Sequence, residues 1–259
     1  MSNTIVVIKT YPDMVNQHKS LPVDYFEIPI RPIIFGKPVS LEEQIEAFLP
    51  IKHKVIGIHG SIYREGVNLC DSGSFAINKQ AFDYVEQAST VFDSIHYQLF
   101  HAGHMIANKD CSFKHIFNFI QQHKLEKLMI EFEPFFSYKE RLVFPLHTVE
   151  EWVEFHKIIK TDIVLDTAHC FITANALRYN FYDYFSQLTE ALNPSVIHLS
   201  TTDLTDGGFN DKHLPFSQGA IDFKRIDHCF RGRILVIEVN NVSLADIEFT
   251  QQLIETIKA

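Results

Sequence analysis

Nine histidine, aspartate and glutamate residues occur at or just after short apolar segments that are typical of buried β-strands. The clearest case is DIVLDTAHCF, where the run Ile163–Leu165 leads into Asp166 and then His169. An ionised carboxylate at the end of a buried strand is costly unless a partner neutralises it. A divalent metal ion is one such partner, and carboxylate and imidazole donors suit Zn²⁺ or Mn²⁺.

The candidate ligands come from six consecutive predicted strands, and all offer oxygen or imidazole donors. They are His59, His101, Glu131, Asp166, His169, His198, Asp211, His213 and Glu238. Taken singly, each histidine is compatible with a hydrogen-bonded core residue, and each glutamate with a salt-bridged one. Taken together, at successive strand ends, they favour a metal site.

Eight strand-like segments alternate with helical ones along the chain. The strands are predicted at Thr4–Lys9, Asp24–Ile30, Lys54–His59, Ile95–His101, Lys127–Glu133, Asp162–Asp166, Ser195–Ser200 and Ile234–Val239. Helices are predicted to begin at the capping boxes of Ser40 and Thr148, and over Asn78–Phe92, Ser112–His123, Phe181–Leu192 and Ser243–Lys258. This alternation predicts an α/β fold, a single (β/α)8 TIM barrel domain over residues 1–259, with the metal site at the carboxyl ends of the strands. A doubly wound sheet is the alternative, but no glycine-rich βα turn supports it.

The composition limits the classes of function. With 46% hydrophobic residues and 23 phenylalanines, the chain can bury a large core. Its net charge of −9 does not support binding to DNA through a broad basic surface. The widely spaced cysteines, without a CxxC pair, are typical of a cytoplasmic protein, and no signal peptide or membrane-spanning segment is expected. Nothing in the sequence indicates an oligomeric state.

Several motifs together resemble a known family. LFHAG, MIEFEP, LDTAH, VIHLS, DKHLPFSQGAIDF and VIEVN, in this order, resemble the xylose-isomerase-like barrel superfamily, and most closely its endonuclease IV branch (AP endonuclease family 2). The resemblance implies up to three zinc ions held by the nine candidates. Single-metal isomerases of the superfamily would need only four of them, namely Glu131, Asp166, His198 and Glu238, with Mn²⁺ or Mg²⁺ as the metal in place of zinc.

The resulting functional prediction is a divalent-metal-dependent, multi-zinc phosphoester hydrolase resembling endonuclease IV, with an apurinic or apyrimidinic site in DNA as one candidate substrate. Glu238 or Glu131 would orient or deprotonate the attacking water. Arg31, Tyr63, Arg64 and Lys212 lie in predicted βα loops and are candidates for substrate binding. Two alternatives stay open: a single-metal sugar or sugar-phosphate isomerase or epimerase, and a binding protein that retains a metal site without turnover.

Overall fold

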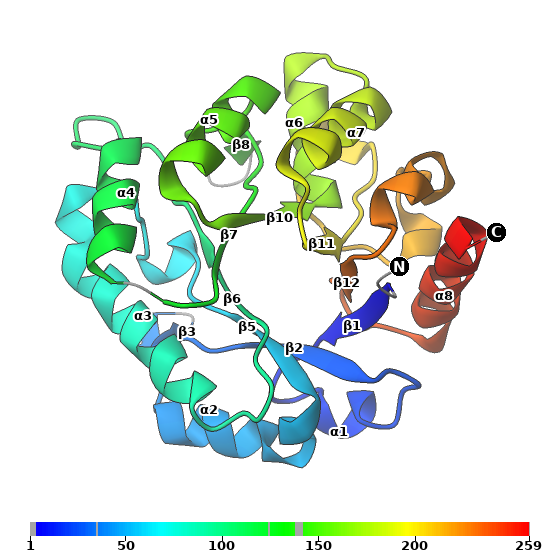
Figure 1. Cartoon of the computed structure of the whole chain (residues 1–259), viewed down its shortest axis with the longest axis horizontal. Helices are drawn as coiled ribbons and strands as arrows, with labels where there is room; N and C mark the ends of the chain where they lie inside the picture. Colours follow the sequence, from blue (N-terminus) through cyan, green and yellow to red (C-terminus); the bar gives the residue numbers. More distant parts are fainter. Residues whose placement is uncertain (1–3, 35, 124, 138–141, 259) are drawn as a thin grey trace. The chain divides into compact units, whose positions relative to one another are not determined.

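A computed structural model of the chain describes residues 4–34, 36–123, 125–137 and 142–258. Within this part, the predicted strands are all present, and their order is that of a closed parallel barrel, β1-β12-β11-β10-β7-β6-β5-β2 (Figure 1). The predicted (β/α)8 fold is therefore confirmed. The contacts divide the chain into two compact units, one of residues 9–131 and one of residues 1–8 with 132–259.

The first unit contains four barrel strands. Its strands are β2 (Tyr25–Pro29), β5 (Val55–His59), β6 (Tyr97–His101) and β7 (Leu128–Glu131), with a small antiparallel pair of β3 (Ile33–Ile34) and β4 (Lys37–Pro38). Its helices are α1 (Val15–His18), α2 (Leu41–Phe48), α3 (Phe75–Ser89) and α4 (Phe113–Gln122). Helix α3 begins at Phe75 rather than at the predicted Asn78, because a 3₁₀ turn capped by Asp71 leads directly into it.

The second unit contains the other barrel strands. They are β1 (Ile5–Lys9, whose last residue belongs to the first unit), β10 (Asp162–Asp166), β11 (Val196–Leu199) and β12 (Ile234–Ile237), with a small antiparallel pair of β8 (Phe136–Ser137) and β9 (Leu142–Val143). The helices of this unit are α5 (Val149–Ile159), α6 (Thr167–Leu177), α7 (Phe181–Leu192) and α8 (Leu244–Lys258). The capping box predicted at Thr148 is present at the start of α5. Helix α6 was not predicted, because it follows β10 with no intervening loop.

Parallel strands of this kind are buried on both faces, and most of their residues here are aliphatic or aromatic. Every residue of β5 and β6 is buried, as are all of β11 and the last four residues of β10. In each of these strands except β11 the last residue is a histidine or an aspartate.

None of the helices in the described residues is both long enough and apolar enough to span a membrane.

Candidate functional site

In the first unit, three predicted ligands converge at the ends of neighbouring strands. His59, His101 and Glu131 are the last residues of β5, β6 and β7, and His101 is in register with Glu131. The Nε2 atoms of His59 and His101 each lie 3.1 Å from Oε2 of Glu131. All three residues are buried, and one donor atom from each lies within 4.8 Å of the others. We call these three residues the first donor group.

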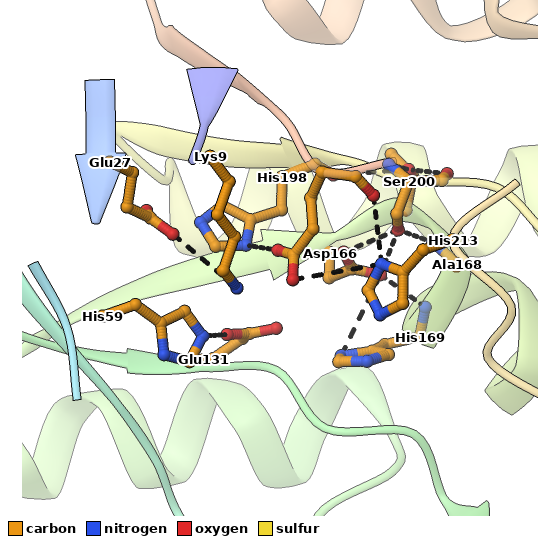
Figure 2. A network of polar contacts seen from close by, with 12 residues as sticks. Lys9, Glu27, His59, Glu131, Asp166, Ala168, His169, His198, Ser200 and His213 are labelled. Carbon is orange, nitrogen blue, oxygen red and sulfur yellow. Dashed lines mark hydrogen bonds and ion pairs between the residues drawn. The ribbon is translucent and has the colours of Figure 1, made fainter. Parts of the chain in front are cut away.

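The imidazole of His59 is held in an orientation that suits a metal ligand. Its Nδ1 lies 2.9 Å from the carbonyl oxygen of Gly60, to which it donates when Nε2 is the acceptor nitrogen. Burial, and after it the ammonium of Lys9, lower the pKa of His59 to about 4, outweighing the influence of Glu131. The ring is therefore neutral at pH 7, and Nε2 points toward Glu131 (Figure 2).

In the second unit, three more predicted ligands lie together. Asp166 ends β10, His198 lies within β11, and Glu238 directly follows β12. Asp166 is in register with His198, which is in turn in register with Val236. Nδ1 of His198 lies 2.5 Å from Oε2 of Glu238, and one donor atom from each of the three residues lies within 4.8 Å of the others. We call Asp166, His198 and Glu238 the second donor group.

Asp166 has two structural roles besides any metal binding. Its carboxylate accepts hydrogen bonds from the backbone N–H of His169 at 2.7 Å, so that it caps the N-terminus of α6, and from the hydroxyl of Ser200 at 2.6 Å (Figure 2). The spacing of three residues between Asp166 and His169 is thus that of a helix N-cap and its N3 position. Nδ1 of His169 lies 2.8 Å from the carbonyl oxygen of Phe132, which leaves Nε2 directed toward Asp211, 3.5 Å away.

Asp211 and His213 lie in the loop after β11 and contact each other. Nε2 of His213 is 2.7 Å from Oδ2 of Asp211, and Nδ1 of His213 is 3.0 Å from the carbonyl oxygen of Glu238. Burial lowers the pKa of His213, but the charge of Asp211 and the hydrogen bond to it outweigh burial and raise the pKa to about 9. Burial raises the pKa of Asp211, but His213 and His169 outweigh it and hold that pKa well below its usual range.

The contact between Asp211 and His213 leads to a prediction of how the stability of the metal-free chain depends on pH. Because the folded-state pKa of His213 is raised from 6.5 to about 9, its stabilising contribution is complete below about pH 6.5 and is lost as the pH rises to about 9. Urea unfolding of chelator-treated protein should show the free energy of unfolding falling across this range. His213→Gln should remove most of this fall, and an equal fall in the variant would contradict the assignment.

Both donor groups fit a divalent metal. Each combines imidazole nitrogen with carboxylate oxygen, the donors that suit Zn²⁺ and Mn²⁺, and each places its donor atoms close enough for one ion to contact them all. His59 and His169 each have their second ring nitrogen against a backbone carbonyl oxygen, which is the usual support of a metal-binding histidine.

The predicted substrate-binding residues lie in the expected loops and have protein partners. Nη1 of Arg31 lies 2.9 Å from Oε1 of Glu65, and the guanidinium of Arg64 lies over the ring of Tyr63. Nζ of Lys212 forms an ion pair with Asp203 at 2.7 Å. Their role toward a substrate stays a prediction.

Three residues near the donor groups were not identified from the sequence. Ser200 holds the carboxylate of Asp166, and Lys9 forms a buried ion pair with Glu27 in the first unit. Lys9 and Glu27 interrupt or end otherwise apolar strands, and this signal resembles the one that identified Asp166. Ser200 follows the end of β11 and carries no comparable signal.

The chain is similar to known proteins in structure but shows no significant similarity to them in sequence. No family model matches the chain, and no curated protein matches it significantly. A D-tagatose 3-epimerase-like protein matches with a TM-score of 0.70 and 15% identity, over 98% of each chain. Endonuclease IV from Thermus thermophilus matches with a TM-score of 0.66 and 17% identity, over 97% of this chain and 99% of its own.

A third match is a Thermus thermophilus protein soaked with zinc chloride, with a TM-score of 0.66 and 15% identity, over 96% of this chain and 98% of its own. At these levels of identity, the matches establish the fold. The chain therefore has the fold of the xylose-isomerase-like (β/α)8 barrel proteins, among which are endonuclease IV and AP endonuclease family 2.

Proposed function

We propose that the chain is a divalent-metal-dependent phosphoester hydrolase of the endonuclease IV kind, with zinc as the metal and abasic sites in DNA as the first substrate to test. The observation that carries the proposal is the number of donors. Besides Glu131, Asp166, His198 and Glu238, the first unit adds His59 and His101. The second unit adds His169, Asp211 and His213. A single-metal isomerase has no need for these five.

The proposed roles follow from the contacts within each unit. Zinc, when bound, lowers the pKa of water and offsets negative charge on a phosphoryl group. Glu238, oriented by His198, is the proposed acceptor for the proton of the attacking water, and Glu131 is the second candidate for that role. His169 and His213, both in contact with Asp211, hold that carboxylate in place. The donors lie near the carboxyl ends of barrel strands, in the segments that follow them, or, for His169, in the first turn of α6, which is where (β/α)8 enzymes carry their chemistry.

A sugar or sugar-phosphate isomerase or epimerase with one Mn²⁺ or Mg²⁺ is the second candidate. The similarity to a D-tagatose 3-epimerase-like protein favours it, as does the presence of the four residues that would hold a single metal. In that case Glu131 and Glu238 would transfer protons at carbon. A cytoplasmic location is proposed for either activity, because all four cysteines are free thiols.

Metal content and substrate range together test the two candidates. Protein purified without chelator is analysed for metal, then assayed with a duplex that carries one abasic site and with a panel of ketoses and ketose phosphates. From the resemblance to endonuclease IV we expect about three zinc ions per chain. We also expect the protein to cleave the abasic duplex. A single Mn²⁺ or Mg²⁺ with turnover of a ketose would establish the second candidate instead. An undamaged duplex of the same sequence is the control for contaminating nucleases.

A further inference from the structure

Lys9 is a buried cation in the first unit that the nine predicted ligands do not include. It is the last residue of β1, and the preceding residue, Ile8, is in register with Ile237 of β12. Lys9 is only 4% exposed, and its Nζ lies 3.8 Å from Oε1 of Glu27, which is fully buried in β2. A lysine ammonium is rarely buried unless it is paired, and Glu27 is one such partner of Lys9.

The surroundings of Glu27 are built to hold this carboxylate. Glu27 is in register with Gly57 of β5, and Gly57 is in register with Tyr97 of β6. The hydroxyl of Tyr97 donates a hydrogen bond of 2.8 Å to Oε2 of Glu27. A Cβ atom at Gly57 would lie 2.3 Å from the ring of Tyr97, so glycine is needed for the ring to cross β5 and reach Glu27. Four strands thus contribute to one buried ion pair.

A gain in stability is a weak explanation of this arrangement. Replacing a buried ion pair by well-packed apolar residues is often neutral or stabilising. The ammonium of Lys9 also lies toward the first donor group, however. Its charge acts on the imidazole of His59, which contacts Glu131. Figure 2 shows the Lys9 side chain running from the end of β1 toward His59 and Glu131, with Glu27 on its other side.

We propose that Lys9 binds a non-bridging phosphoryl oxygen of the substrate, and that Glu27 and Tyr97 position its ammonium for this contact. The proposal deepens the proposed function, because it rests on a phosphoester as the substrate class. An ammonium is a compact point charge that commonly binds phosphate. The positive charge of Lys9 is balanced by the negative charge of Glu27. One bound dication would carry more charge than the carboxylate of Glu131, so the first donor group would have a net positive charge and attract an anion.

Inorganic phosphate is the probe that tests this role without reference to turnover. Its binding to the full, zinc-loaded chain is measured by calorimetry, and the zinc content of each variant is measured in parallel. We expect Lys9→Met together with Glu27→Gln to weaken phosphate binding by about tenfold or more, because a charge-assisted contact is lost. Glu27→Gln alone keeps the ammonium and should weaken binding less. Lys19→Met, which removes an exposed lysine whose ammonium contacts the side chain of Asn16, is the control that should bind as the unsubstituted chain does.

The double variant is needed because Lys9→Met alone removes a cation that is paired with the buried carboxylate of Glu27. If the double variant keeps its zinc and binds phosphate as tightly as the unsubstituted chain, Lys9 is only a core ion pair and the proposal is overturned. Absence of phosphate binding to the unsubstituted, zinc-loaded chain would overturn it as well. Phosphate binding that depends on Lys9, in a chain that leaves the abasic duplex intact, would support this inference and count against the proposed substrate alone.

Discussion

Glu238→Gln is expected to reduce hydrolysis of an abasic duplex by about 100-fold or more, because it removes the proposed proton acceptor and keeps the size of the side chain. Glu238 is only 9% exposed and directly follows β12, and its Oε2 lies 2.5 Å from Nδ1 of His198. Glutamine retains an oxygen acceptor but has no basicity near neutral pH. The measurement is the rate of cleavage at saturating zinc, so that weaker metal binding by the variant does not account for the loss.

Glu248→Gln provides the matched control. Glu248 lies on α8 in the same unit, is exposed, and its replacement makes the same change in charge. We expect its rate to equal that of the unsubstituted chain. The free energy of unfolding of both variants is measured in parallel, so that loss of folded protein does not account for the loss of rate. Full activity in folded Glu238→Gln protein would move the proton-accepting role to Glu131 or exclude both carboxylates.

The strand ends were predictable from the sequence because one signal defines both the fold and the candidate site. A buried parallel strand requires an aliphatic run, and a polar residue that ends such a run stands out against it. His59, His101 and Asp166 were found in this way, and each is the last residue of its strand. Glu131 was predicted to lie within a strand that continues to Glu133. In the structure β7 ends at Glu131 itself.

The contacts that support the ligands could not be predicted in this way, because they join residues that are distant in sequence. Ser200 reaches Asp166 only because β10 and β11 are neighbours with Asp166 in register with His198. The pairing of Lys9 with Glu27 likewise depends on how the first strands are arranged. The start of α6 was missed for a local reason, since Asp166 was interpreted as a ligand and not also as a helix cap.

Asp166→Asn is expected to weaken zinc binding without lowering the stability of the metal-free protein. Asp166 is fully buried, and its carboxylate accepts hydrogen bonds from Ser200 and from the backbone of His169. Asparagine keeps an oxygen that can cap α6 and accept from Ser200, but it lacks the charge that a zinc ligand supplies. Zinc affinity should therefore fall by about 100-fold or more, a larger loss than the roughly 10- to 100-fold typical of residues that only support a ligand.

In chelator-treated protein, the same substitution should leave the free energy of unfolding unchanged or raise it, because burying a neutral amide costs less than burying a carboxylate. Zinc added to the unsubstituted chain should raise its midpoint of thermal unfolding, and this increase should be much smaller in Asp166→Asn. Asp162→Asn is the matched control, since Asp162 is the exposed residue at the other end of β10. If Asp166→Asn destabilised the metal-free chain by several kcal/mol while its zinc affinity was unchanged, Asp166 would be a helix cap and core acceptor, and the second donor group would lose its central ligand.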